Sequence, residues 1–329
     1  AMYNFVFYIY KSHLSSTNYI ELTEILNLEG VPASCMWQMA NPKHWRDPNR
    51  EPDTDPTLTE AFRAHVEPYL CTAKRGYVCK ILLYRVFNYI LYRLYTVCQW
   101  DALPIAADPK HPEQKEMSPD AVAYHFRKWC RDGSLKQVWH NSIAVIRELL
   151  NVAELNLDGS HTIAKKGGDT VAYQGRKKAK TSNILPLIDK KDFIIASTTI
   201  IAGNHNDAFE LKQTCRSSSR ISKQQQITIK GAYLNADSAF DTKAARKVCF
   251  NHGVVPNIPE NQRNRKLLKR GRKRLFNPVI CKHHFSTERT FAWIDKFKAL
   301  LVCFERKGSY FFSLNCLVFA LINLQGMIC

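Results

Sequence analysis

Three acidic residues of this chain occupy positions where side chains can do chemistry. Asp158 and Asp237 each follow a short apolar run, the pattern of a buried strand that has just ended, and Glu288 lies in a stretch of helical character. Carboxylates hold Mg²⁺ or Mn²⁺ well, and two such ions roughly 3.5–4 Å apart activate the attacking group and stabilise the leaving oxygen in phosphodiester cleavage. If the fold brings the three acids together, they predict a metal site that works on phosphate.

Each acid also has an ordinary explanation. Asp158 precedes Gly-Ser and fits the start of a turn, and Asp237 fits a helix cap. Glu288 fits a solvated position on a helix. The residues around the three acids must therefore decide between a shared site and three unrelated surface roles.

Almost all of the positive charge lies in the half of the chain that carries these acids. Residues 1–150 hold 17 Lys and Arg against 16 Asp and Glu, a net of +1, whereas residues 151–329 hold 30 against 13, a net of +17. Such an asymmetry points to a polyanionic partner, and nucleic acid is the first candidate. A solvated basic face or an anionic membrane surface is the alternative.

The cysteines and the apolar C-terminal segment weigh against other classes of protein. The chain has 11 cysteines without a CxxC pair, which favours free thiols in a reducing cytosol over a disulfide framework. Cys249-x-x-His252 and Cys281-x-His283 do not have a recognised zinc spacing. The apolar segment 311–324 is shorter than the roughly 20 residues of a membrane span, so we expect a buried core helix and no membrane partner.

The first 150 residues are expected to form two regions. Residues 1–56 read as an extension that ends in a linker rich in Pro and Asp. Residues 57–150 are expected to form a helical, DNA-binding domain, with apolar residues at helical spacing over 81–94, a second helix from Ser118-Pro119 and a third after Ser134. Three short helices joined by tight turns fit either a helix-turn-helix or a plain bundle.

From residue 151 onward the pattern changes to that of an α/β domain, which should extend to residue 329. Short runs rich in β-branched residues predict strands at 155–158, 184–188, 193–201, 234–237 and 254–258. Helical patterns follow at about 207–215, 241–251 and 287–304. Strands with helices interleaved among the later ones indicate a mixed sheet with flanking helices.

Several motifs together resemble one family. They are Leu157-Asp158-Gly159-Ser160-His161, Ala236-Asp237-Ser238-Ala239-Phe240-Asp241 and Glu288-Arg289-Thr290-Phe291-Ala292-Trp293, with Cys98-Gln99-Trp100-Asp101-Ala102-Leu103-Pro104 before them. The acids occur in order, 79 and then 51 residues apart. In these features the chain resembles the DDE transposases of bacterial insertion sequences, most closely the insertion-sequence-five group, over roughly residues 60–324.

The resemblance implies an RNase H-like catalytic domain over residues 151–329, preceded by a helix-turn-helix-like domain. It implies that Asp158, Asp237 and Glu288 bind Mg²⁺ or Mn²⁺, as two ions, and catalyse cleavage at the 3′ ends of a mobile element and strand transfer. The partners would be terminal inverted repeats and target DNA, bound by a homodimer or higher oligomer. The protein would then be cytoplasmic and associated with the nucleoid.

Basic residues near the acids are the expected DNA contacts. One group follows the first strand region and consists of Arg176, Lys177, Lys178 and Lys180, for which a solvated hairpin edge is the alternative. A second group lies in the stretch 263–274, where eight of twelve residues are Lys or Arg, and consists of Arg270, Arg272, Lys273 and Arg274. The first group is expected to follow the phosphate backbone. The second group is expected to form a flexible arm that orders on DNA, with disorder or a nucleic-acid patch without base specificity as the alternative.

The surroundings of Glu288 depart from the family pattern. Related transposases often carry a basic residue four positions before this glutamate and another seven after it, where this chain has His284 and Asp295. We expect Arg289 and Lys296 to substitute as phosphate contacts. Trp293 is expected to pack in the core, with stacking on an unpaired DNA base as the alternative.

Two other functions remain open at this stage. One is a transposase-derived DNA-binding protein without catalysis, which would be free to lose any of the three acids. The other is an RNase H-fold nuclease that cleaves DNA without strand transfer. The acids by themselves do not separate cleavage from transfer.

Overall fold

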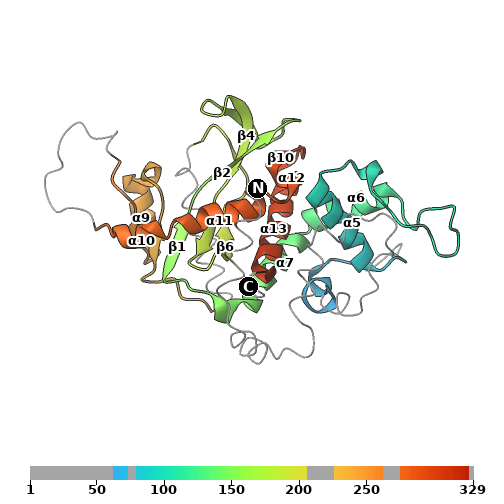
Figure 1. Cartoon of the computed structure of the whole chain (residues 1–329), viewed down its shortest axis with the longest axis horizontal. Coiled ribbons are helices and arrows are strands. Elements are labelled where there is room, and N and C mark those ends of the chain that lie inside the picture. Colours follow the sequence, from blue (N-terminus) through green and yellow to red (C-terminus); the bar gives the residue numbers. More distant parts are fainter. Residues whose placement is uncertain (1–61, 73–78, 206–225, 262–274, 326–329) are drawn as a thin grey trace, which may run out of the picture.

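The computed structural model describes residues 62–72, 79–205, 226–261 and 275–325. In this part of the chain the protein is a mixed α/β structure with two sheets and flanking helices (Figure 1). The mixed sheet expected from the sequence is confirmed. The expected extension 1–56, the helix at 207–215 and the basic residues Arg270, Arg272, Lys273 and Arg274 lie outside the described residues.

The first sheet has five strands in the order β6-β5-β1-β8-β9. The bounds are β1 Glu154–Leu157, β5 Pro186–Asp189, β6 Ile194–Ser197, β8 Tyr233–Asn235 and β9 Val255–Asn257. On one side of β1 each neighbouring pair, β1 with β5 and β5 with β6, is antiparallel. On the other side the pairs β1 with β8 and β8 with β9 are parallel. β1, β5 and β6 are buried throughout. β5 and β6 are mostly apolar, as buried strands usually are, whereas β1 alternates polar Glu154 and Asn156 with Leu155 and Leu157.

The second sheet continues from the first through a long, bent hairpin. Its strands are β2 Ser160–Ala164, β3 Ala172–Gln174, β4 Ala179–Ile184, β7 Ile201–Ala202 and β10 Val302–Cys303. Leu157 pairs with Leu187 in the first sheet and Ser160 pairs with Ile184 in the second, so one antiparallel register runs through both. The bend between β1 and β2 falls at Asp158-Gly159. β2 and β3 were not expected as strands, because they are only partly buried and lack an apolar run.

The helices of the N-terminal half begin and end close to their expected positions. They are α5 Leu83–Thr96, α6 Pro119–Arg131 and α7 Ser134–Val145. The Ser118 hydroxyl caps α6 by accepting from the backbone N–H of Ala121 at 3.2 Å. Gly133 between α6 and α7 has φ of +80°, a conformation that favours glycine and permits the tight turn. Short 3₁₀ turns lie at Glu67–Tyr69, Trp100–Ala102, Arg147–Leu149 and Ser238–Phe240.

α7 is packed against the last helix, α13 (Gly308–Gln325). The buried Trp139 of α7 donates its Nε1–H to the carbonyl of Ile194 at 3.1 Å. Asn323 of α13 donates to the same carbonyl at 3.0 Å and accepts from the Ile194 N–H at 2.8 Å. The apolar face of α7 is therefore covered, although α6 and α7 meet at a tight turn as a helix-turn-helix would require.

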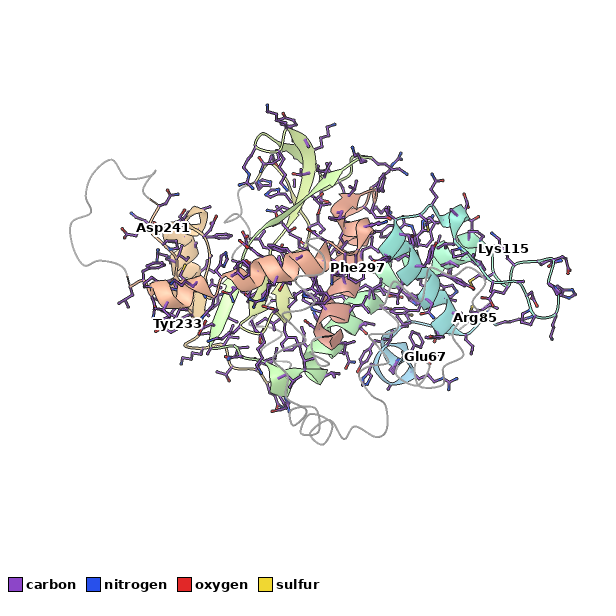
Figure 2. All side chains as sticks on the ribbon, viewed as in Figure 1. Glu67, Arg85, Lys115, Tyr233, Asp241 and Phe297 are labelled. Carbon is purple, nitrogen blue, oxygen red and sulfur yellow. The ribbon has the colours of Figure 1, made fainter. Side chains whose placement is uncertain are left out.

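One hydrophobic core runs across the boundary expected at residue 150, from Phe62 to Leu324. Near the centre of Figure 2, Phe297 lies where α12 (Lys298–Leu301) packs against α5. Its ring meets that of Tyr95 edge-on at a centroid distance of 6.2 Å. α13 is a buried core helix, as expected, and no helix among the described residues has both the length and the apolar character to cross a membrane.

The single helix expected at 287–304 is wrong. The structure has α11 Phe285–Ile294, then a break, then the short α12, and the chain finally forms strand β10. Phe297 is extended at the break and buried, and β10 pairs with β2. Tertiary packing thus overrides a continuous helical pattern. The expected helix at 241–251 is confirmed as α9 Lys243–Asn251, and α10 Pro278–Lys282 is an additional helix.

Candidate active site at the strand ends

Strand pairing brings Asp158 and Asp237 to neighbouring positions. β1 and β8 are parallel, and Asn156 of β1 pairs with Asn235 of β8. Asp158 and Asp237 each lie two residues further along, just beyond the last paired residues of the two strands. Because the carboxyl ends of parallel strands open at the same edge of a sheet, both acids follow strands that end there, and we call this edge the strand-end site.

Each aspartate also shapes its own turn. Asp158 Oδ1 accepts from the backbone N–H of Gly159 at 2.7 Å, at the bend between the two sheets. Asp237 Oδ1 accepts from the N–H of Ala239 at 2.8 Å and caps the 3₁₀ turn that follows. Asp158 is half-buried and Asp237 is exposed, so solvent reaches the strand-end site. The turn roles expected as ordinary explanations are therefore real, and they hold the carboxylates at this edge.

Glu288 comes to the same region on α11, which packs against β1 and β5. It is exposed in the first turn of the helix. Burial lowers the pKa of His284, one turn earlier, whereas the carboxylates of Asp237 and Glu288 act in the opposite direction. Both acids are therefore within electrostatic range of one imidazole. This places Glu288 near the strand-end site without making it part of the same turn.

The donors at this site fit a hard divalent cation in their chemistry. Mg²⁺ is usually held by one or two carboxylates and completes its shell with water and substrate phosphate oxygens, which suits Asp158 and Asp237. In the described residues no group of three or more His, Cys, Asp or Glu side chains is gathered closely enough to hold a metal ion. The structure thus offers a pair of carboxylates with Glu288 nearby, and the expected roles of all three remain predictions.

The basic residues after the first strand lie on the hairpin that leaves the site. Arg176, Lys177 and Lys178 form the exposed turn between β3 and β4, and Lys180 is exposed on β4 opposite Tyr173. Lys177 Nζ donates to the backbone carbonyl of His161 at 2.9 Å, which turns that side chain back along the hairpin. The DNA-binding role of this group remains a prediction.

Three residues expected to contact DNA around Glu288 have partners within the protein. Arg289 makes two hydrogen bonds to the carboxylate of Asp192, from Nε and from one terminal nitrogen, both at 2.7 Å. The ammonium of Lys296 lies 3.3 Å from the centre of the Trp293 ring. Trp293 is half-buried and packs against the hydrophobic core, as expected. Their expected contacts with DNA remain predictions.

Sequence analysis missed the polar side chains immediately behind the acids. Asn156 and Asn235 precede Asp158 and Asp237 by two residues, are buried, and join through a hydrogen bond from Asn235 Nδ2 to Asn156 Oδ1 of 2.9 Å. The available signal was the repeated Asn-x-Asp spacing at both strand ends. Glu154, two residues earlier still, was also missed.

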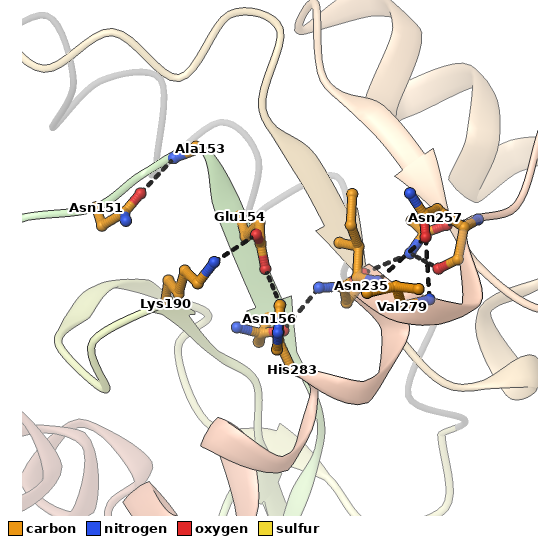
Figure 3. A network of polar contacts seen from close by, with 11 residues as sticks. Asn151, Ala153, Glu154, Asn156, Lys190, Asn235, Asn257, Val279 and His283 are labelled. Atoms are coloured by element: carbon orange, nitrogen blue, oxygen red, sulfur yellow. Dashed lines mark hydrogen bonds and ion pairs between the residues drawn. The ribbon is translucent and has the colours of Figure 1, made fainter.

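Glu154 ties β1 to the junction between α10 and α11. Its two carboxylate oxygens meet Lys190 Nζ at 2.8 Å and His283 Nδ1 (Figure 3). Burial alone would raise the pKa of Glu154, but the hydrogen bonds from Lys190 and His283 outweigh it and lower that pKa. The strand that ends at Asp158 is thus linked to the segment that leads to Glu288.

Comparison with known proteins gives one match to a family. The family model described as DDE superfamily endonuclease matches residues 157–323, a span that includes all three acids and half of the chain. No curated protein matches the chain. Among solved structures, the Mos1 transposase paired-end complex with left transposon end is similar at 11% sequence identity. That match covers 93% of this chain and 95% of the other, with a TM-score of 0.25.

Proposed function

The chain belongs to the DDE superfamily of endonucleases, and we propose that it acts as a DNA transposase. In this proposal it binds the terminal inverted repeats of a mobile element, cleaves at their 3′ ends and transfers those ends into target DNA. Asp158, Asp237 and Glu288 are the acidic residues of its active site. The proposed mobile element is a bacterial insertion sequence of the insertion-sequence-five group.

The pairing of β1 with β8 carries the proposal. It brings two acids that are 79 residues apart to adjacent strand ends, at an edge that solvent reaches. A turn or a cap needs only one acid, whereas two carboxylates at one edge provide ligands for a divalent cation that binds phosphate oxygens. The order of three antiparallel strands followed by two parallel ones supports an RNase H-like sheet.

The chain's own residues would act mainly by binding and orientation. Asp158 and Asp237 would hold Mg²⁺ or Mn²⁺, and Glu288 is the proposed third ligand. The bound metal would activate the attacking oxygen and stabilise the leaving one. Because phosphoryl transfer depends on positioning and charge stabilisation, the protein needs no covalent nucleophile.

DNA would approach along the basic hairpin. The exposed turn with Arg176, Lys177 and Lys178 lies on the same hairpin as Asp158, which sits at its bend. A phosphate backbone that follows this hairpin would therefore lead to the carboxylates. A homodimer or higher oligomer is proposed to hold paired element ends.

A metal-dependent joining assay with labelled terminal repeats tests the function. We expect joined product in Mg²⁺ or Mn²⁺ for the wild type and its loss in Asp158→Asn and Asp237→Asn, with DNA binding retained. Glu148→Gln is the matched control, because Glu148 is an exposed acid that pairs with its neighbour Arg147.

The same assay distinguishes the other functions. Shifted DNA that is never cut would show a DNA-binding protein without catalysis. Nicked ends that are never joined would show a nuclease. Joining that survives Asp158→Asn would refute the assigned active site.

A further inference from the structure

A row of buried asparagines crosses the first sheet just behind the strand ends. Asn156, Asn235 and Asn257 are paired with one another in register on β1, β8 and β9, and each is almost fully buried. Asn257 Nδ2 donates to Asn235 Oδ1 at 2.7 Å, and Asn235 Nδ2 donates to Asn156 Oδ1 at 2.9 Å (Figure 3). We call these three side chains the asparagine relay.

The backbone of Asn277 fixes the direction of the relay. Its N–H donates to Asn257 Oδ1 at 2.7 Å, and its carbonyl accepts from Asn257 Nδ2 at 3.0 Å. A backbone N–H can only donate and a carbonyl can only accept, so the Asn257 amide has one possible orientation. Each following amide must then donate toward β1, which leaves the Nδ2 group of Asn156 at the end.

The amide group at that end of the relay lowers the stability of the fold. Asn156 Nδ2 is buried and has no hydrogen-bond partner among the described residues. A buried donor without a partner costs about 1–3 kcal/mol. Apolar side chains at positions 156 and 235 would remove this unpaired donor, so the stability of the core does not explain the two asparagines.

The relay connects all three segments that carry the acids. Asn156 stands two residues before Asp158, which directly follows the end of β1. Asn235 stands two residues before Asp237 in the same way. Asn277 caps the start of α10, which leads to α11 and Glu288.

The relay also specifies how the strands are aligned. A slip of one residue between β1 and β8 would set an asparagine against an apolar neighbour and would turn one aspartate away from the other. Hydrogen bonds between buried amides penalise that slip, whereas contacts between aliphatic side chains are non-directional and tolerate it. The alignment of the carboxylates therefore depends on the amides behind them.

We propose that the asparagine relay is a positioning device that holds Asp158, Asp237 and the α10–α11 segment in the arrangement that binds the divalent cation. This inference rests on the proposed function. The asparagines do not touch the metal or DNA, and they act through the strands that carry the acids.

Mn²⁺ binding to the full chain without DNA tests the inference, by titration calorimetry or electron paramagnetic resonance. Asn156→Leu is the principal variant. It removes the unpaired donor of Asn156 and one hydrogen bond and leaves the Asn235 donor unpaired, so the melting temperature should fall less than on loss of several buried hydrogen bonds. Loss of groups that orient metal ligands typically lowers metal affinity about 10–100-fold, and we expect a drop of that size.

Two further variants separate positioning from stability. Asn323→Leu removes three hydrogen bonds of an equally buried asparagine, between α13, α7 and β6, and should lower the melting temperature without changing Mn²⁺ affinity. Asn277→Asp keeps both the oxygen that caps α10 and the backbone groups that hold Asn257, so it should bind Mn²⁺ like the wild type.

The outcomes distinguish this inference from the proposed function. If Asp158→Asn and Asp237→Asn lose Mn²⁺ but Asn156→Leu binds it as tightly as the wild type, the relay inference is wrong and the active site stands. If the wild type binds no Mn²⁺, or the aspartate variants bind it unchanged, the metal site fails and the inference fails with it. If Asn156→Leu and Asn323→Leu lose Mn²⁺ affinity equally, the loss reflects lower stability of the fold, and the positioning role of the relay is refuted.

Discussion

Arg289, an expected DNA contact, forms an ion pair with Asp192 within the protein, and this pair offers the arginine a structural role. Two hydrogen bonds of 2.7 Å join the guanidinium to both carboxylate oxygens, and Thr290 Oγ1 donates to the carbonyl of Asp192 at 3.4 Å. Asp192 has φ of +74° in the turn between β5 and β6. The pair thus attaches α11, and with it Glu288, to the first sheet.

The size of this effect follows from exposure and geometry. The side chain of Arg289 is 40% exposed and that of Asp192 is 19% exposed, so solvent screens much of the attraction. Exposed pairs contribute about 0.2–1 kcal/mol, and bidentate geometry favours the upper end. We therefore predict a coupling free energy of about 1 kcal/mol between Arg289→Met and Asp192→Ala in a double-mutant cycle.

Urea unfolding of the four proteins measures this coupling, and DNA binding as a function of salt gives the second readout. If Arg289 serves the fold, Arg289→Met leaves the salt dependence of DNA binding unchanged. If it contacts a phosphate, the slope of log K against log salt falls by about 0.9 while the coupling is near zero. That second result would refute the predicted coupling and would support the expected contact of Arg289 with DNA.

Three further predictions concern the sheets and the hairpin. A Cβ on Gly203 would lie 1.9 Å from Thr181 Oγ1, so Gly203→Ala should destabilise the protein by about 1–3 kcal/mol in thermal unfolding, and an unchanged melting temperature would contradict the packing of β7 on β4. Burial raises the pKa of Asp189 from 3.8 to about 6, so its contribution to stability is complete below pH 3.8 and is lost as the pH rises through about 6. The unfolding free energy of the wild type relative to Asp189→Asn should therefore decline over that range, and a flat difference would exclude the raised pKa. Arg176→Ala and Lys178→Ala should each reduce the salt slope of DNA binding by about 0.9, and equal slopes would mean that the hairpin turn does not contact DNA.

Short-range signals in the sequence determined several elements of this protein. The start of α6 at Ser118-Pro119 was predictable because a cap and a following proline act within one turn of helix. Strands β1 and β8 were predictable from apolar runs, and the acids were seen to follow them. The charge of the second half, net +17, indicated a polyanionic partner without any knowledge of the fold.

Tertiary structure decided what those elements do together. Nothing local requires β1 to pair with β8 in parallel, yet that pairing sets the strand ends that precede Asp158 and Asp237 side by side. The break after α11 depends on the burial of Phe297, and β10 exists because β2 offers it an edge. Asn156 and Asn235 are ordinary polar residues in the sequence. They become a hydrogen-bonded pair because residues far apart in the chain meet in register, and the sequence pattern records only near neighbours.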